Sequence, residues 1–195
     1  MAIINAFLPT LIRAGVAVAL ALGAARADTL SDVAGRYTIQ PSSHVGFTVA
    51  QVGGGGIVGD FKKFTGVFAL NESDIGRSTI DFTLYPESVS TGQPRIESFL
   101  RSDAVFDSAN FPTIKFRSTR ITQSGPDTAE IAGILTARGK SSPANFHASL
   151  SGHGKNSITF HVDGKIMRSR YGMDVGTPIY SNVVQFEMII QGQRS

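Results

Sequence analysis

Cysteine and tryptophan are absent from the 195 residues, and the absence of cysteine removes several kinds of chemistry. Without cysteine the chain has no disulfide framework, no thiolate ligand for zinc and no cysteine nucleophile. Charge is also nearly balanced, because 18 Lys and Arg oppose 15 Asp and Glu. Nucleic-acid binding usually needs basic residues gathered on one face. We therefore expect no nucleic-acid partner.

Long apolar runs are scarce too, and the one that stands out is at the N-terminus. Residues 14–25 follow Arg13, are almost wholly apolar and end in the small-x-small sequence Ala25-Arg26-Ala27. This pattern is typical of a cleaved signal peptide, and the run is shorter than the roughly 20 residues of a membrane span. We predict a signal peptide at 1–27 and one exported domain at 28–195, with no stable membrane insertion. The alternative is a retained N-terminal anchor helix.

Helical periodicity is nearly missing from the remainder, where apolar and polar residues alternate instead. A period of two predicts strands with one buried face. About eight such strands occur, at residues 45–49, 64–70, 80–84, 114–116, 131–135, 146–150, 158–166 and 184–190. Many short strands separated by polar turns favour a β-sandwich or a closed barrel, and the alternation alone does not distinguish the two.

Three segments depart from the alternation. Residues 94–101 place Ile96, Phe99 and Leu100 at helical spacing, which predicts a short helix between the third and fourth strands. A run of four glycines at 53–56 predicts a flexible connection. Residues 171–182 have little alternation and predict a long loop, which could be either a functional loop or an ordinary crossover.

Candidate catalytic and metal-binding residues are few. His147, His153 and His161 lie close in sequence, but no third ligand has suitable spacing, so we interpret them as surface histidines and predict no metal site. No Gly-x-Ser-x-Gly elbow precedes a helix. We accordingly predict no catalytic residues, no enzymatic activity and no cofactor, although Ser, His and Asp are all present.

Two pairs of charged residues have two possible roles each. Arg101 with Asp103, and Arg168 with Asp174, could form polar clusters at the mouth of a barrel and meet the head group of a ligand. Such residues more often cap a helix or pair locally, and we favour that structural role for both pairs.

The predicted inner face is rich in phenylalanine, which suits a filled core and a ligand cavity equally well in a barrel of this size. Small residues expected to point inward, and so to leave space, are Gly46, Gly66, Gly133, Ala148 and Gly164. The candidate ligand-binding residues in the lumen are Val45, Phe47, Val49, Phe64, Phe68, Ile80, Phe82, Leu84, Phe116, Leu135, Phe146, Phe160, Ile166 and Phe186.

Several motifs along the predicted domain resemble those of the YceI-like, or polyisoprenoid-binding, family. The sequence 100–107 reads Leu-Arg-Ser-Asp-Ala-Val-Phe-Asp, and 111–118 reads Phe-Pro-Thr-Ile-Lys-Phe-Arg-Ser. These are similar to the family's Leu-Arg-Ser-x-x-Phe-Phe-Asp and Phe-Pro-x-Ile-x-Phe-x-Ser motifs. Residues 133–139 resemble its Gly-x-Leu-Thr-x-Arg-Gly hairpin, and 168–173 its Arg-x-x-(Phe/Tyr)-Gly-(Met/Ile) element.

The resemblance implies an all-β, eight-stranded antiparallel lipocalin-like barrel in the periplasm, with an elongated apolar lumen. It implies a carrier that holds a long apolar small molecule, such as a polyisoprenoid, a quinone-like molecule or another long-chain lipid. A homodimer is also plausible. The alternative function is a barrel with a filled core that acts through its loops as a stress-response or protein-interaction module.

Overall fold

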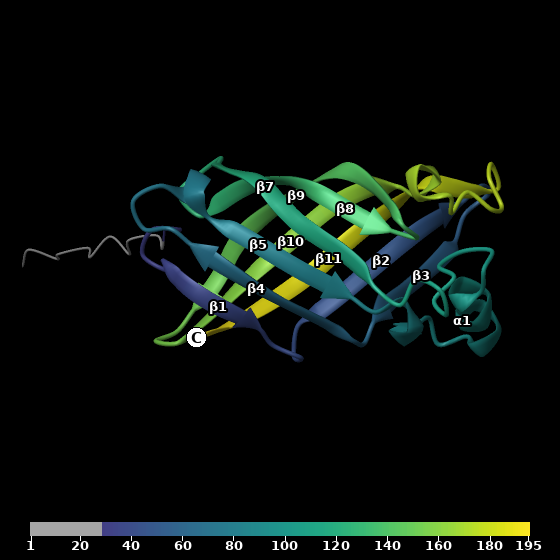
Figure 1. Cartoon of the computed structure of the whole chain (residues 1–195), viewed down its shortest axis with the longest axis horizontal. Coiled ribbons are helices and arrows are strands. Elements are labelled where there is room, and N and C mark those ends of the chain that lie inside the picture. Colours follow the sequence, from purple (N-terminus) through teal and green to yellow (C-terminus); the bar gives the residue numbers. More distant parts are fainter. Residues whose placement is uncertain (1–28) are drawn as a thin grey trace, which may run out of the picture.

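Long β-strands dominate the structure, a computed structural model that describes residues 29–195 (Figure 1). The predicted signal peptide lies outside these residues. The strands are β1 (Gly35–Ile39), β2 (His44–Gln51), β3 (Gly56–Phe61), β4 (Phe64–Leu70), β5 (Thr79–Leu84), β6 (Val89–Ser90), β7 (Ile114–Gln123), β8 (Thr128–Ala137), β9 (Lys140–His153), β10 (Ser157–Met167) and β11 (Tyr180–Arg194). The helical elements are α1 (Pro94–Arg101) and three 3₁₀ turns, η1 (Ile75–Arg77), η2 (Pro86–Ser88) and η3 (Arg168–Tyr171). None of the described helices has the length and apolar character needed to cross a membrane.

The sheet closes on itself through β1, which pairs with β4 on one side and β11 on the other. The closed ring therefore contains eight strands in the order β1-β4-β5-β7-β8-β9-β10-β11, and every pairing is antiparallel. This confirms the predicted eight-stranded barrel and excludes the sandwich. Closure leaves the ring without a free strand edge.

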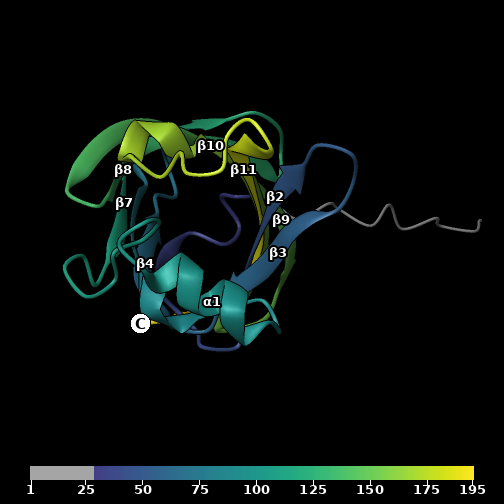
Figure 2. The same ribbon diagram turned by 90° about the vertical axis from the view of Figure 1, so that its right-hand side faces the viewer.

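Three further strands, β2, β3 and β6, extend the wall at one end. The long strand β11 pairs with β1 near its C-terminus and with β2 along residues 180–189. β2 in turn pairs with β3, and β3 pairs with the two-residue β6. Helix α1 follows β6 and covers this end of the barrel (Figures 1 and 2). Its residues, 94–101, are those predicted to form a short helix between the third and fourth predicted strands.

Alternation missed β1, β3 and the two-residue β6. β1 has the sequence Gly-Arg-Tyr-Thr-Ile, in which only Tyr37 and Ile39 are buried. β3 begins at Gly56, the last residue of the glycine run that we expected to be a flexible connection. Gly56 has φ of +142° and lies so close to the backbone of β2 that a Cβ atom would meet a carbonyl of Val49. The glycine therefore permits a tight start to the strand.

The N-terminal segment closes the end of the barrel opposite α1. Leu30 and Val33 are 2% and 3% exposed. The Leu30 amide donates to the carbonyl of Pro126 at 3.0 Å, which ties the segment to the β7–β8 turn. Tyr37 Oη donates to the Val33 carbonyl at 2.8 Å and accepts from Arg194 Nη2 at 2.8 Å. In Figure 2, which looks in from the α1 end, this purple segment crosses the far end of the ring.

Candidate functional site

The barrel encloses a cavity of about 340 Å³ whose wall is almost entirely apolar. This lies within the roughly 300–1,000 Å³ that is typical of small-molecule sites. Side chains from the strand wall, from α1 and from the segment before β1 all contribute to it. Among the described residues that line it, Arg168 alone carries a charge. An apolar cavity of this size can hold an apolar molecule without polar contacts.

Thirteen of the fourteen candidate lumen residues line this cavity: Val45, Phe47, Val49, Phe68, Ile80, Phe82, Leu84, Phe116, Leu135, Phe146, Phe160, Ile166 and Phe186. Phe64 differs, because it is half-buried near the start of β4 and packs on Phe82 with ring centroids 6.0 Å apart, and it does not reach the cavity. The structure thus brings the predicted set together, while their role in binding a ligand stays a prediction.

Inward phenylalanines lie over glycines of neighbouring strands. Phe47 faces Gly59 across β2 and β3, and a Cβ on that glycine would approach the ring to 2.9 Å. Phe82 faces Gly66 in the same way, with 3.1 Å. Glycine lets a ring lie flat against the wall. The space left by each glycine is therefore taken by a ring, and the rings are kept out of the middle of the lumen.

The same arrangement recurs further round the barrel. Phe146 covers Gly164, and Phe116 covers Gly133. Gly46 was predicted to point inward and does not. The neighbouring Phe47 lines the cavity, and a Cβ on Gly46 would meet the exposed His44 ring on the outer face. Period-two alternation places Gly46 outside for the same reason that it places Phe47 inside.

Sequence reasoning missed the lining residues that come from outside the eight predicted strands. The apolar face of α1 contributes Ile96, Phe99 and Leu100, and β3 contributes Ile57 and Phe61. The helical spacing on α1 was a usable signal, because an amphipathic helix must place its apolar face against the core. No signal of comparable strength marked β3.

Arg168 has a structural role at the α1 end of the cavity. Its guanidinium donates to the carbonyls of Met173, Val175 (2.9 Å), Tyr180 (3.1 Å) and Ser181 (2.8 Å) and so holds together the loop between η3 and β11. Burial lowers the pKa of Arg168, an effect that the charge of Asp174 reduces. No hydrogen bond joins these two residues among the described contacts, so loop carbonyls take the place of the predicted local pair.

Arg101 contacts its own surroundings. Its Nε donates to the Glu87 carbonyl and its Nη2 to the Val89 carbonyl, both at 2.9 Å. Nη2 also lies 3.6 Å from the Glu97 carboxylate. Backbone amides of Thr91 and Gly92 donate to that carboxylate and lower the pKa of Glu97. The cluster fixes α1 to η2 and β6, which is the structural role that we favoured; Asp103 is exposed.

Tyr171 is an unusual member of the cavity wall. It is 1% exposed, and its hydroxyl has no hydrogen-bond partner among residues 29–195. Burial raises the pKa of the Tyr171 hydroxyl, an effect that the nearby Ser142 and Arg170 side chains reduce. A buried hydroxyl without a partner is costly by about 1–3 kcal/mol.

The histidines lie on the outer wall. His147 Nδ1 is 2.8 Å from Glu130 Oε1 across β8 and β9, and His161 is exposed on β10. In the described part of the chain, no group of three or more His, Asp or Glu side chains is arranged to hold a metal ion.

The fold and the cavity together define the class: a closed, antiparallel, lipocalin-like barrel with an apolar interior. Within that class the chain belongs to the YceI-like family, because the model of the YceI-like domain matches residues 37–191. The chain is 28% identical over 172 residues to the protein YceI of Salmonella arizonae, covering 84% of this chain and 90% of that protein. It is 27% identical over 183 residues to a UPF0312 protein of Photorhabdus laumondii, covering 90% and 95%.

Solved structures share the fold. BcnA of Burkholderia cenocepacia superimposes with a TM-score of 0.73 at 22% identity, covering 78% of this chain and 98% of that one. A domain of Saccharophagus degradans described as polyisoprenoid-binding gives 0.67 at 12% identity, covering 83% and 99%. At these identities the likeness is one of fold.

Proposed function

We propose that this protein is a periplasmic carrier that holds a long apolar molecule in the lumen of its barrel. The ligand class is a polyisoprenoid, a quinone-like molecule or another long-chain lipid. The protein acts by removing the chain of the ligand from water, without making or breaking bonds and with no cofactor beyond the bound lipid itself.

The observation that carries this proposal is the apolar cavity of about 340 Å³. Burial of each CH₂ group contributes about 0.8 kcal/mol, so a long chain binds tightly without polar contacts. The filled-barrel alternative predicts no such space. The choice of a polyisoprenoid over other chains has support from the family resemblance and from the description of the Saccharophagus degradans domain, which says what that domain binds.

The polar groups of the wall support binding over catalysis. The Arg168 guanidinium is occupied by four loop carbonyls. The Tyr171 hydroxyl has no described partner that could act on it as a base. General acid–base and nucleophilic catalysis both need such a partner within hydrogen-bonding reach. A homodimer stays a prediction.

Native mass spectrometry of protein isolated from the organism that makes it, followed by organic extraction, tests the proposal. We expect a stoichiometric long-chain molecule, and its identity names the cargo. An apolar ligand of another kind would support the carrier function and rule out an isoprenoid as the cargo. A mass without ligand, together with no uptake of quinones or fatty acids, would overturn the carrier.

A matched pair of variants ties the ligand to the lumen. Ala148 lines the cavity on β9, and Ala148→Phe adds a ring to the space that a ligand would use. Ala132 lies on the outer face of the neighbouring β8, so Ala132→Phe is the control. We expect the extracted ligand per folded molecule to fall only in Ala148→Phe. An equal load in both variants would place the ligand outside the lumen.

A further inference from the structure

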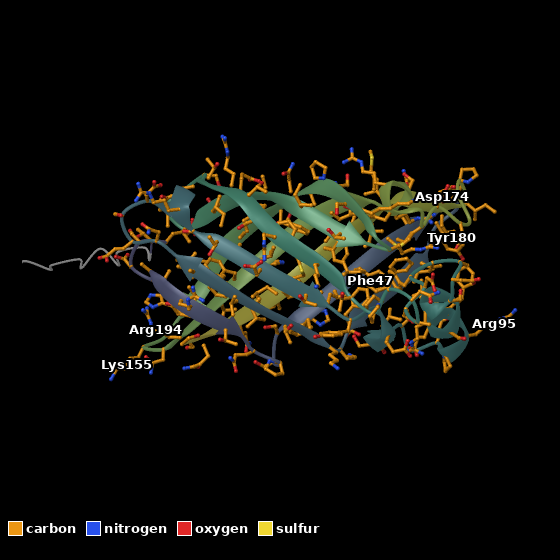
Figure 3. All side chains as sticks on the ribbon, in the orientation of Figure 1. Phe47, Arg95, Lys155, Asp174, Tyr180 and Arg194 are labelled. Atoms are coloured by element: carbon orange, nitrogen blue, oxygen red, sulfur yellow. The ribbon has the colours of Figure 1, made fainter. Side chains whose placement is uncertain are left out.

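The cavity reaches the surface at the α1 end of the barrel. Phe99 on α1 and Val175 in the loop before β11 both line the cavity, yet their side chains are 44% and 42% exposed. Figure 2 looks directly onto this end, where α1 lies at the lower side of the strand ring and the loop after η3 at the upper side. The same end carries Arg95 and Asp174 at its tip in Figure 3.

Two further exposed apolar side chains lie beside this opening. Val52 in the β2–β3 turn is 74% exposed and Ile179 is 59% exposed. The Val52 amide donates to the Ile179 carbonyl at 2.9 Å, so the two loops lie side by side. We call Val52, Phe99, Val175 and Ile179 the mouth rim. Single exposed apolar residues are ordinary, whereas here Phe99 and Val175 also line the cavity, so that apolar surface continues from the outside into the lumen.

Basic side chains occur at the same end of the barrel. Arg95 is exposed on α1 and projects from the tip of the molecule (Figure 3). Lys140 and Arg170 are exposed beside η3, where Arg170 Nη1 lies 3.4 Å from Ser142 Oγ. The segments at this end, residues 91–113, 137–141 and 165–181, contain seven Lys and Arg, of which Arg168 is buried, and four Asp and Glu. The turns of the opposite end, 29–34, 71–78, 124–127 and 154–156, contain two Lys and Arg and four Asp and Glu, and Arg194 of β11 adds one cation at that end (Figure 3).

We propose that the α1 end docks on an anionic lipid surface, with the mouth rim among the lipid head groups and Arg95, Lys140 and Arg170 against the lipid phosphates. Basic side chains near an anionic membrane each contribute about fivefold in affinity. Apolar side chains add the burial that holds a protein at the interface. The cargo then passes between bilayer and lumen without crossing water. This inference goes beyond the proposed function, because the docking surface exists whether or not the lumen is loaded.

The charges favour a lipid surface over the other occupants of such a patch. A second copy docked symmetrically through this end would set its basic residues against the same basic residues. A protein seated over the rim would also cover the opening through which Phe99 and Val175 reach the cavity. A lipid surface meets both the charge and the apolar rim, and it is the source and destination of a long apolar chain.

Cosedimentation with vesicles tests the rim. The purified protein is mixed with vesicles of phosphatidylcholine alone or of phosphatidylcholine with phosphatidylglycerol. Val52→Ser with Ile179→Ser removes two rim side chains that do not line the cavity. Val67→Ser with Ile189→Ser is the control, because these side chains are 37% and 47% exposed on the outer faces of β4 and β11. We expect about tenfold weaker binding in the rim variant and unchanged binding in the control.

A second matched pair tests the charge. Arg95→Gln removes a cation at the α1 end, and Lys155→Gln removes one at the opposite end (Figure 3). We expect about fivefold weaker binding to phosphatidylglycerol vesicles for Arg95→Gln and no change for Lys155→Gln. Binding of the unaltered protein should also weaken as salt increases.

Each outcome decides the proposal. Absence of vesicle binding, or equal losses in both members of either pair, would overturn docking through the α1 end. Loss of a copurifying protein in the rim variant, with vesicle binding retained, would make the surface a protein interface instead. Ligand content is extracted from every variant, so an empty barrel that still binds vesicles refutes the carrier and leaves docking standing. A barrel that contains ligand but does not bind vesicles refutes docking and leaves the carrier function standing.

Discussion

The two ends of the barrel are built differently. At the closed end, Leu30 and Val33 are buried under the turns, and Tyr37 joins Val33 to Arg194 through two hydrogen bonds of 2.8 Å. At the α1 end, loops and a short helix surround an opening, and apolar side chains such as Phe99 remain exposed. The closed end hides its apolar residues, whereas the open end presents them.

The polar contacts differ in the same way. At the closed end, the Tyr37 hydroxyl joins the Val33 carbonyl to the Arg194 side chain. At the open end, one buried cation, Arg168, binds four loop carbonyls. Further hydrogen bonds hold the same loop, because Arg138 Nη1 donates to the Gly172 carbonyl at 2.8 Å and the Ser169 amide donates to Asn182 Oδ1 at 2.9 Å. The strand wall and the closed end therefore enclose the cavity, whereas at the α1 end the cavity reaches the surface beside Phe99 and Val175.

The largest effect should come from Arg168→Met, which leaves the four loop carbonyls without their donor. We expect the free energy of unfolding to fall by roughly 4 kcal/mol, measured by urea denaturation. Arg170→Met is the matched control, because that side chain is exposed and makes one 3.4 Å contact. Equal losses in both variants would mean that the loop does not depend on the buried guanidinium.

Leu30→Ala should have the next largest effect, because it removes a side chain that is 2% exposed in the closed end. We expect a loss of roughly 3 kcal/mol in the free energy of unfolding. Val52→Ala at the open end, where the side chain is 74% exposed, should change it by less than about 0.5 kcal/mol. Similar losses at the two positions would remove the contrast between closed and open ends.

Tyr37→Phe tests the polar link of the closed end. The change removes the hydroxyl that donates to Val33 and accepts from Arg194. We expect a loss of roughly 1.5 kcal/mol, visible as a lower midpoint in thermal or urea unfolding. An unchanged midpoint would show that water replaces both contacts at no cost.

Tyr171→Phe should act in the opposite direction and by the smallest amount. The buried Tyr171 hydroxyl has no described partner, so its removal should raise the free energy of unfolding by about 1 kcal/mol. Its raised pKa adds a pH dependence: the folded state holds the proton more tightly, so stability is lost as pH rises above the ordinary tyrosine value of 10.0.

The measurement is urea unfolding of both proteins at neutral pH and above that value. Tyr171→Phe should lose less stability at alkaline pH than the unaltered protein, because it lacks the hydroxyl whose pKa is raised by burial. A parallel loss in both proteins at alkaline pH would show that folding does not raise the pKa of Tyr171. A lower midpoint of Tyr171→Phe at neutral pH would show that the hydroxyl has a stabilising partner.

The strands that carry strong alternation could be predicted from the sequence, and β10 and β11 are the best examples. The two strands pair over eleven residues, and one face of that long pair points into the barrel. Apolar residues must therefore recur at every second position over a long stretch. β3 could not be predicted, because it is a short strand with two glycines whose role depends on the partner strand.

The cavity itself lay beyond prediction from residues alone. Alternation identifies which side chains face inward, but the free volume depends on where each ring lies. Phe82 lies flat because Gly66 is its partner across the pair, and that pairing is known only once the register is known. Phe64 faces Leu84 instead and packs on Phe82, away from the cavity.

The double pairing of β11 has a consequence for how the barrel is made. β1 and β2 are synthesised early, and both take their last partner from β11, at the opposite end of the chain. Contacts between such distant segments form slowly. Until the ribosome has released residues 180–194, the two ends of the sheet stay unjoined and expose backbone groups that invite aggregation. The barrel therefore closes only after its final strand is complete.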